Sequence, residues 1–114
     1  MSLIYKLLDQ AAWGEAQAAG AFKGSAVDLA DGFIHFSSAG QVAETARRHF
    51  AGQAGVVLLT VDADRLDQPL RWEPSRGGDL FPHLYAPLPA SAVISERLLE
   101  LDADGVPIVG ELAA

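Results

Sequence analysis

Short apolar runs and two stretches of helical spacing alternate along the chain. Residues 3–8 form an apolar segment of strand length. Asp9 is a suitable N-cap for a helix that runs to about Ala19, because alanines recur there at helical spacing, and Gly20 is suited to end it. The pattern therefore predicts a strand followed at once by a helix, and then a loop or weak strand over residues 21–31.

The second helical stretch gives the clearest signal in the sequence. Ser38 and Gln41 have the spacing of a capping box, in which each side chain bonds the backbone of the other residue. An apolar stripe at helical spacing follows them. The pattern predicts a helix over residues 39–50.

The remaining apolar runs predict strands. Residues 56–61 are an unbroken run of β-branched residues and leucines, which is typical of a strand buried on both faces. Residues 70–73 predict a short strand, and residues 80–89, with three prolines, predict an ordered, partly extended loop. Residues 92–101 suit a helix by spacing, whereas the turn signal at 103–105 favours a hairpin.

No repeat, low-complexity tract or linker divides the sequence. We therefore predict one compact α+β domain over residues 1–114, with mixed or antiparallel sheets and two main helices. Fifteen acidic residues against eight basic ones give a net charge of −7, which argues against binding nucleic acid by bulk charge. The absence of cysteine excludes disulfides, thiolate metal sites and a cysteine nucleophile. No signal peptide or membrane segment is visible, so we expect a cytoplasmic protein; the oligomeric state stays open.

Candidate chemistry begins at His35, inside an apolar run. Side chains alternate between the faces of a strand, so His35 and Ser37 share one face. The helix start at Ser38 offers free N–H groups that suit an anion. These features predict a ligand site. The competing interpretation is a core histidine with a backbone partner and a serine pair that only caps the helix.

A second concentration of polar and aromatic residues lies in residues 72–85. Arg76 is followed by two glycines and can present its guanidinium to a ligand. His83 and Tyr85 share a face if this segment is extended. The alternative is a surface turn with a solvated arginine and polar tips over an apolar core.

Other reaction classes lack their motifs. His35, His83, Glu73 and Asp79 have the right chemistry for a metal, but no short ligand spacing occurs, so no metal site is predicted. A metal-assisted hydrolase using His35, His83 and Asp79 stays an alternative. No nucleophile elbow, P-loop or dinucleotide fingerprint is present.

Two segments carry a resemblance to known proteins. Asp31-Gly32-Phe33-Ile34-His35-Phe36-Ser37 and Trp72 through Tyr85, with Pro87-Leu88-Pro89, resemble an uncharacterised bacterial family, domain of unknown function 952, over nearly the whole chain. More distantly, the order of elements is similar to the NAD-binding lobe of RNA 2′-phosphotransferases, which have the ADP-ribosyltransferase fold. His35-Phe36-Ser37 stands at that family's His-Leu-Ser strand, and Lys6-Leu7-Leu8 replaces its His-Gly-Thr.

The distant resemblance implies an ADP-ribosyltransferase-like domain that binds NAD, ADP-ribose or a related nucleotide in a cleft. NAD would then be a substrate, and the reaction would be transfer or hydrolysis of ADP-ribose. A non-enzymatic binding module on the same fold is the alternative, so catalysis stays open. The resemblance and the residue pattern together nominate binding residues Lys6, His35, Ser37, Arg76 and Tyr85, and catalytic residues His35, His83 and Glu73.

Overall fold

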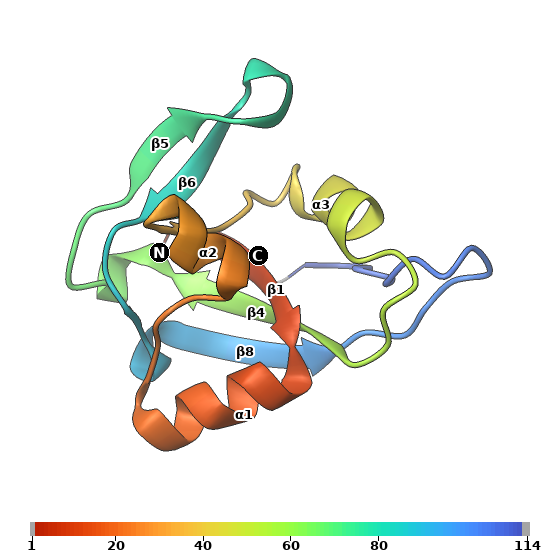
Figure 1. Ribbon diagram of the computed structural model, residues 1–114, viewed down its shortest axis with the longest axis horizontal. Coiled ribbons are helices and arrows are strands. Elements are labelled where there is room, and N and C mark those ends of the chain that lie inside the picture. The colour runs from red at the N-terminus through yellow and green to blue at the C-terminus, as the bar shows by residue number, and fades with distance from the viewer. Residues whose placement is uncertain (1, 113–114) are drawn as a thin grey trace.

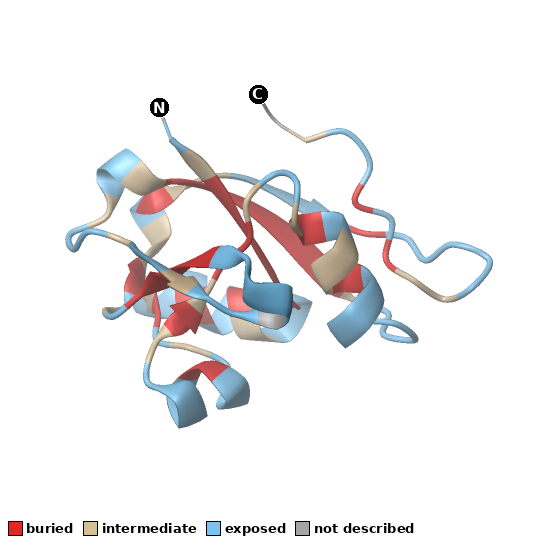
Figure 2. Ribbon diagram, turned by 90° about the horizontal axis from the view of Figure 1, so that it is seen from above, coloured by how far each residue is buried: buried red, intermediate tan, exposed pale blue. Residues whose placement is uncertain are grey.

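The apolar run at residues 56–61 forms β4 (Val56–Asp62), the middle strand of a three-stranded antiparallel sheet. β1 (Leu3–Asp9) and β8 (Val93–Leu98) pair with it on either side. Every residue of β4 is buried, and Figure 2 shows this strand red along its length. Its apolar side chains alternate between two buried clusters, which confirms the prediction of a strand buried on both faces. The computed structural model describes residues 2–112, and of Arg76 only the backbone.

Two helices cover the two faces of this sheet. α1 (Gln10–Ala19) contributes Trp13 to one buried cluster, and α3 (Val42–His49) contributes Val42 to the other. α1 confirms the predicted helix: the Asp9 carboxylate accepts a hydrogen bond from the backbone N–H of Ala11, and a left-handed glycine ends the helix.

α3 begins later than predicted. The backbone N–H of Ser38 donates to the side-chain oxygen of Gln41 at 3.0 Å, so half of the expected capping box forms. Residues 39–41 form a turn, and the helix starts at Val42. The predicted start at residue 39 is therefore wrong by three residues, because the amide group of Gln41 also turns away from the helix to donate to the carbonyl of Leu80.

A third helix was missed. α2 (Ala26–Asp31) begins with a complete capping box between Ser25 and Asp28, in a segment predicted to be a loop or weak strand. The helix has only six residues, and its apolar Val27 and Leu29 are exposed. No buried stripe therefore announced it in the sequence, although the capping pair was visible.

The second large sheet is antiparallel and has the order β3-β6-β5. It is built from β3 (Ile34–His35), β6 (Leu80–Leu84) and β5 (Arg71–Pro74), and β7 (Leu88–Pro89) pairs separately with β2 (Ala21–Phe22). The segment 80–89 is partly extended, as predicted, but it forms the strands β6 and β7 rather than a loop. Pro82 lies in the middle strand, where its carbonyl still accepts a hydrogen bond from the N–H of Phe36 at 3.1 Å.

The last ambiguous segment also folds as a strand. β8 replaces the helical alternative over residues 92–101, and a bridge between Leu101 and Pro107 closes the hairpin-like turn that follows. The described chain is thus a compact α+β fold with three α-helices and antiparallel sheets. Figure 1 shows the β5–β6 arm projecting away from the sheet of β1, β4 and β8. None of the described helices has the length and apolar character needed to cross a membrane.

Candidate functional site

Strand pairing brings the two predicted histidines together. His35 of β3 lies directly opposite His83 of β6, and their ring centroids are 5.4 Å apart in an edge-on arrangement. Phe33 stacks on His83 at 4.1 Å and contacts His35 at 4.6 Å. The ring of Tyr85 lies 5.1 Å from Phe33. We call Phe33, His35, His83 and Tyr85 the ring cluster.

His35 is held between two aspartates of α2. Its Nδ1 lies 2.6 Å from Oδ1 of Asp28, and its Nε2 lies 2.9 Å from Oδ2 of Asp31. Both bonds can exist together only when both ring nitrogens carry hydrogen. The side chain of Asp28 is 2% exposed and that of Asp31 is 49% exposed. Asp28 is therefore a fixed partner, whereas Asp31 can turn into solvent and uncover Nε2.

Lys6 supplies the charge that balances Asp28. Its ammonium lies 3.2 Å from both carboxylate oxygens of Asp28 and donates to the backbone carbonyl of His35 at 2.7 Å. Burial lowers the pKa of Lys6, and Asp28 opposes that shift only in part. Lys6 was predicted to contact a ligand directly. The structure buries it, and its described hydrogen bonds go to Asp28 and His35.

Asp28 stays ionised despite its burial. Desolvation would raise its pKa, but the Lys6 ammonium and the hydrogen bonds donated by Ser25 and His35 outweigh it. The net effect lowers the pKa of Asp28 below its ordinary value. A buried carboxylate with this many donors is a strong anchor for the imidazole of His35.

Glu73 organises the other half of the ring cluster. Its Oε1 accepts hydrogen bonds from the hydroxyl of Tyr85 at 2.7 Å and from Nδ1 of His83 at 2.9 Å. These two bonds lower the pKa of Glu73, and the bond from Tyr85 raises the pKa of that phenol. The guanidinium of Arg71 lies over the Tyr85 ring, 4.6 Å from its centroid. Glu73 is thus a carboxylate beside His83.

His83 is buried, and it keeps one unsatisfied atom. Its side chain is 4% exposed, and its Nε2 has no hydrogen-bond partner among the described residues. Because Nδ1 donates to Glu73, Nε2 is a bare acceptor in the neutral ring. His83 therefore contacts Glu73, Phe33 and His35 and is almost closed off from solvent.

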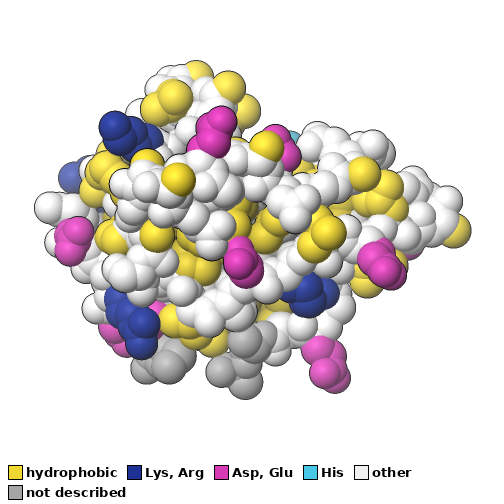
Figure 3. Space-filling model, turned by 90° about the horizontal axis from the view of Figure 1, so that it is seen from below, with side chains coloured by type: hydrophobic (Ala, Val, Ile, Leu, Met, Phe, Trp, Pro, Cys, Tyr) yellow, Lys and Arg dark blue, Asp and Glu magenta, His cyan; other side chains and the backbone are white. Residues whose placement is uncertain are grey.

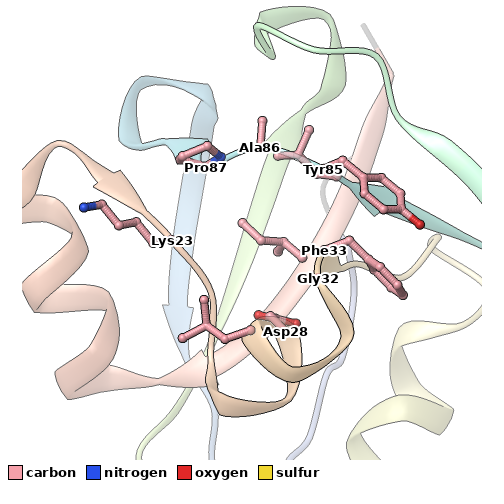
Figure 4. Close-up of a pocket in the computed structure, with 10 residues that line it drawn as sticks. Lys23, Asp28, Gly32, Phe33, Tyr85, Ala86 and Pro87 are labelled. Atoms are coloured by element: carbon pink, nitrogen blue, oxygen red, sulfur yellow. The ribbon is translucent and has the colours of Figure 1, made fainter.

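A hollow of about 250 Å³ opens beside the ring cluster, between α2 and the segment that joins β6 to β7. Figure 4 shows the rings of Phe33 and Tyr85 together at one end and Lys23 toward the other, with Asp28 below. His35 does not line the hollow; it contacts Phe33, which does. The lining residues are Lys23, Asp28, Leu29, Gly32, Phe33, Ile34, Leu84, Tyr85, Ala86 and Pro87.

The other predicted residues lie apart from this group or outside the described atoms. The hydroxyl of Ser37 lies 3.0 Å from that of Thr45 on α3 and is buried there. The Arg76 side chain lies outside the described part of the structure. The described residues contain no group of three His, Asp or Glu side chains that could hold a metal, so the metal-assisted alternative loses its support.

Sequence reasoning overlooked several residues of the site. Asp28 was hidden because α2 was missed; the capping pair of Ser25 and Asp28 was the available signal. Asp31 stood in the segment that carries the family resemblance but was not nominated as a site residue. Lys23 and Arg71 carried no motif. Their positions follow from the pairing of β2 with β7 and of β5 with β6.

The family "Protein of unknown function (DUF952)" matches residues 7–96. The chain belongs to this family. The DUF952 chain is also similar to protein CC0527 from Caulobacter crescentus: its crystal structure is 59% identical, with a TM-score of 0.91 over 96% of each chain. The solution NMR structure of CC0527 is 59% identical, with a TM-score of 0.85 over 96% of this chain and 95% of the other. No curated protein matches the chain.

The surface charge of this DUF952 protein is dispersed where it can be seen. On the face in Figure 3, acidic and basic side chains lie scattered among neutral and apolar surface. Near the hollow, Lys23 lines the wall and the guanidinium of Arg71 lies over the Tyr85 ring.

Proposed function

We propose that the protein binds a nucleotide of the NAD or ADP-ribose class in the hollow, with His35 as the group that transfers a proton. The observation that carries this proposal is the bond between partly exposed His35 and buried Asp28, beside a hollow with aromatic rings at one end. A histidine held by a buried carboxylate is a common arrangement for general acid–base chemistry.

The hollow offers complementary contacts to such a ligand. The base or nicotinamide ring stacks on Phe33 and Tyr85, and Lys23 faces a phosphate. The volume of about 250 Å³ holds the ring end, so the rest of a dinucleotide extends over the surface. Arg76 remains a proposed phosphate contact from the loop that joins β5 to β6. Lys6 does not touch the ligand; it holds Asp28 and the backbone of His35.

If the protein is an enzyme, the resemblance to the ADP-ribosyltransferase fold favours cleavage at the ribose. The bond between C1′ and the nicotinamide nitrogen breaks, and the electron pair leaves with neutral nicotinamide. When Asp31 turns away, Nε2 of His35 first gives its own hydrogen to solvent. An acceptor oxygen, from water or another hydroxyl, then forms the new bond to C1′ and gives its proton to the bare Nε2. The carboxylate of Glu73 stabilises the positive charge that develops on the ribose.

Binding is tested by calorimetry with NAD, ADP-ribose and AMP, each up to millimolar concentration. We expect measurable heat with at least one of them, and loss of at least tenfold in affinity in His35→Gln. His49→Gln is the matched control, because His49 lies on the exposed end of α3. Absence of heat with all three ligands would refute the nucleotide proposal.

A non-enzymatic binding module is the second candidate, and one observation favours it. Lys6 stands where the RNA 2′-phosphotransferases carry their first-strand histidine, and it is buried and bonded to Asp28. Chromatographic detection of free nicotinamide after incubation with NAD separates the two candidates. Release that His35→Gln abolishes supports the enzyme, and binding without release supports the module.

A further inference from the structure

Lys6 lies under the site, where nothing in the proposed reaction uses it directly. Its side chain is 8% exposed, and its ammonium donates both to Asp28 and to the backbone carbonyl of His35. A buried lysine costs free energy unless its charge is matched and its hydrogens are bonded. Here one ammonium contacts both the ring partner of His35 and the backbone of His35 itself.

We infer that Lys6 is a positioning residue that holds His35 with hydrogen on Nδ1 and leaves Nε2 as the atom that exchanges protons. This role deepens the proposed function, and it rests on that proposal only for the statement that Nε2 takes part in proton transfer. A carboxylate beside an ammonium stays ionised and only accepts hydrogen bonds. Nδ1 of His35, at 2.6 Å from Asp28, must then be the donor.

The donors around Asp28 leave no room for a proton on it. Oδ1 accepts from the backbone N–H of His35 at 3.1 Å as well as from Nδ1 and Lys6. Oδ2 accepts from the backbone N–H of Ser25 at 2.8 Å and from Lys6 at 3.2 Å. Without the ammonium, a proton on buried Asp28 becomes favourable, and Asp28 can then donate to a bare Nδ1. That proton on Asp28 comes from solvent, and the ring hydrogen would then lie on Nε2.

Four ionisable groups face His35 from the elements around it. Asp28 and Asp31 belong to α2, Lys6 belongs to β1, and His83 belongs to β6. Among the described residues that face His35, Lys6 is the one that carries an ammonium, and Asp31 is half-exposed. Lys6 is therefore the group whose removal changes the balance between the two ring nitrogens most directly.

Nitrogen NMR of the free protein tests this inference, because two-bond proton–nitrogen couplings show which ring nitrogen carries hydrogen. In a pH series we expect wild-type His35 to show hydrogen on Nδ1 once its ring is neutral, and the variants are compared at that same pH. Lys6→Met is expected to populate the Nε2–H form at least several-fold more, whereas Lys6→Arg, which keeps the charge, is expected to retain the wild-type pattern. The signals of His49 serve as the internal reference and should not change.

Two results would overturn the inference: an Nε2–H tautomer in the wild type, or a folded Lys6→Met variant with an unchanged His35 pattern. If Lys6→Met does not fold, as circular dichroism would show, the wild-type tautomer decides alone. No ligand is present in this experiment. A protein that binds no nucleotide but shows the Nδ1–H tautomer would therefore refute the proposed function and support the role of Lys6.

Discussion

The two three-stranded sheets are both antiparallel, but they differ in the side chains that they carry on their faces. In the β1-β4-β8 sheet, the middle strand is buried on both faces, and apolar side chains fill both sides. In the β3-β6-β5 sheet, one face carries buried Ile34 and Leu84, whereas the other carries His35, His83 and Glu73. The first sheet builds the apolar core, and the second carries ionisable side chains on one face. The comparison shows that a sheet can carry several ionisable side chains on one face when its other face packs into the core.

Lys6 connects the two sheets. It belongs to β1 of the apolar sheet, and its ammonium reaches Asp28 and the carbonyl of His35 in β3. The polar face is therefore supported by a charge that the apolar sheet supplies. Substitutions on either side of this connection should have effects of different size and kind.

The largest effect is expected from the apolar sheet. Leu59→Ala empties a fully buried position in β4 and should lower the free energy of unfolding by about 4 kcal/mol, through lost burial and a cavity. Leu98→Ala in β8 is the control, because Leu98 is 54% exposed, and it should cost less than about 1 kcal/mol. Urea denaturation measures both; equal losses would contradict the assigned burial.

The next effect tests the polar connection. Asp28→Asn keeps the shape of the side chain but leaves the Lys6 ammonium buried without a countercharge, so we expect a loss of about 3 kcal/mol. Asp31→Asn is the matched control on the same helix, and its half-exposed pair should cost less than about 1 kcal/mol. If the two variants denature at the same urea concentration, Asp28 does not anchor the Lys6 ammonium and the His35 ring.

Acid should reduce the difference in the free energy of unfolding between wild type and Asp28→Asn. The folded-state pKa of Asp28 is lowered, so its contribution to stability is present above about pH 4 and is lost as the pH falls through the folded value. The stability of the wild type should therefore fall more steeply below pH 4 than that of the variant. Denaturation series from pH 7 to pH 2 measure the two slopes.

Glu44 provides the comparison for that acid series. Hydrogen bonds from Arg47 and Arg48 lower its pKa to about 2, so it titrates in the same range. Its pairs lie on the exposed surface of α3, where solvent screens them. Glu44→Gln should leave the acid slope nearly as in wild type. If the stability of Glu44→Gln falls with acid as little as that of Asp28→Asn, the acid sensitivity comes from the surface pairs of Glu44 and not from the buried Asp28.

The smallest effect is expected at the cap of α2. Ser25→Ala removes a hydroxyl that accepts from the backbone N–H of Asp28, at a cost of about 1 kcal/mol. Ser91→Ala, at an exposed serine, is the control and should change stability by less than about 0.5 kcal/mol. Hydrogen exchange should show faster opening of residues 26–31 in the cap variant alone. Unchanged exchange there would mean that the Ser25 hydroxyl does not hold the helix.

Part of the candidate site could be predicted from sequence. The alternation of side chains along an extended segment places His83 and Tyr85 on one face, and Glu73 indeed bonds both. The same rule pairs His35 with Ser37, but Ser37 continues into a bridge with Tyr5 and its hydroxyl lies against Thr45. β3 has only two residues and ends at His35. The alternation of side chains along the strand therefore does not predict the surroundings of Ser37, which lies beyond its end.

Local pattern determined what depends on neighbours along the chain: the continuous apolar strand, the cap and end of α1, and the α+β class. Only the tertiary structure decided that β3 pairs with β6 and that α2 brings Asp28 between Lys6 and His35. The physical reason is that a buried charge is stable only beside its counterion, and here the partners lie 22 residues apart in sequence. Periodicity shows which faces are apolar, but it does not show which faces meet.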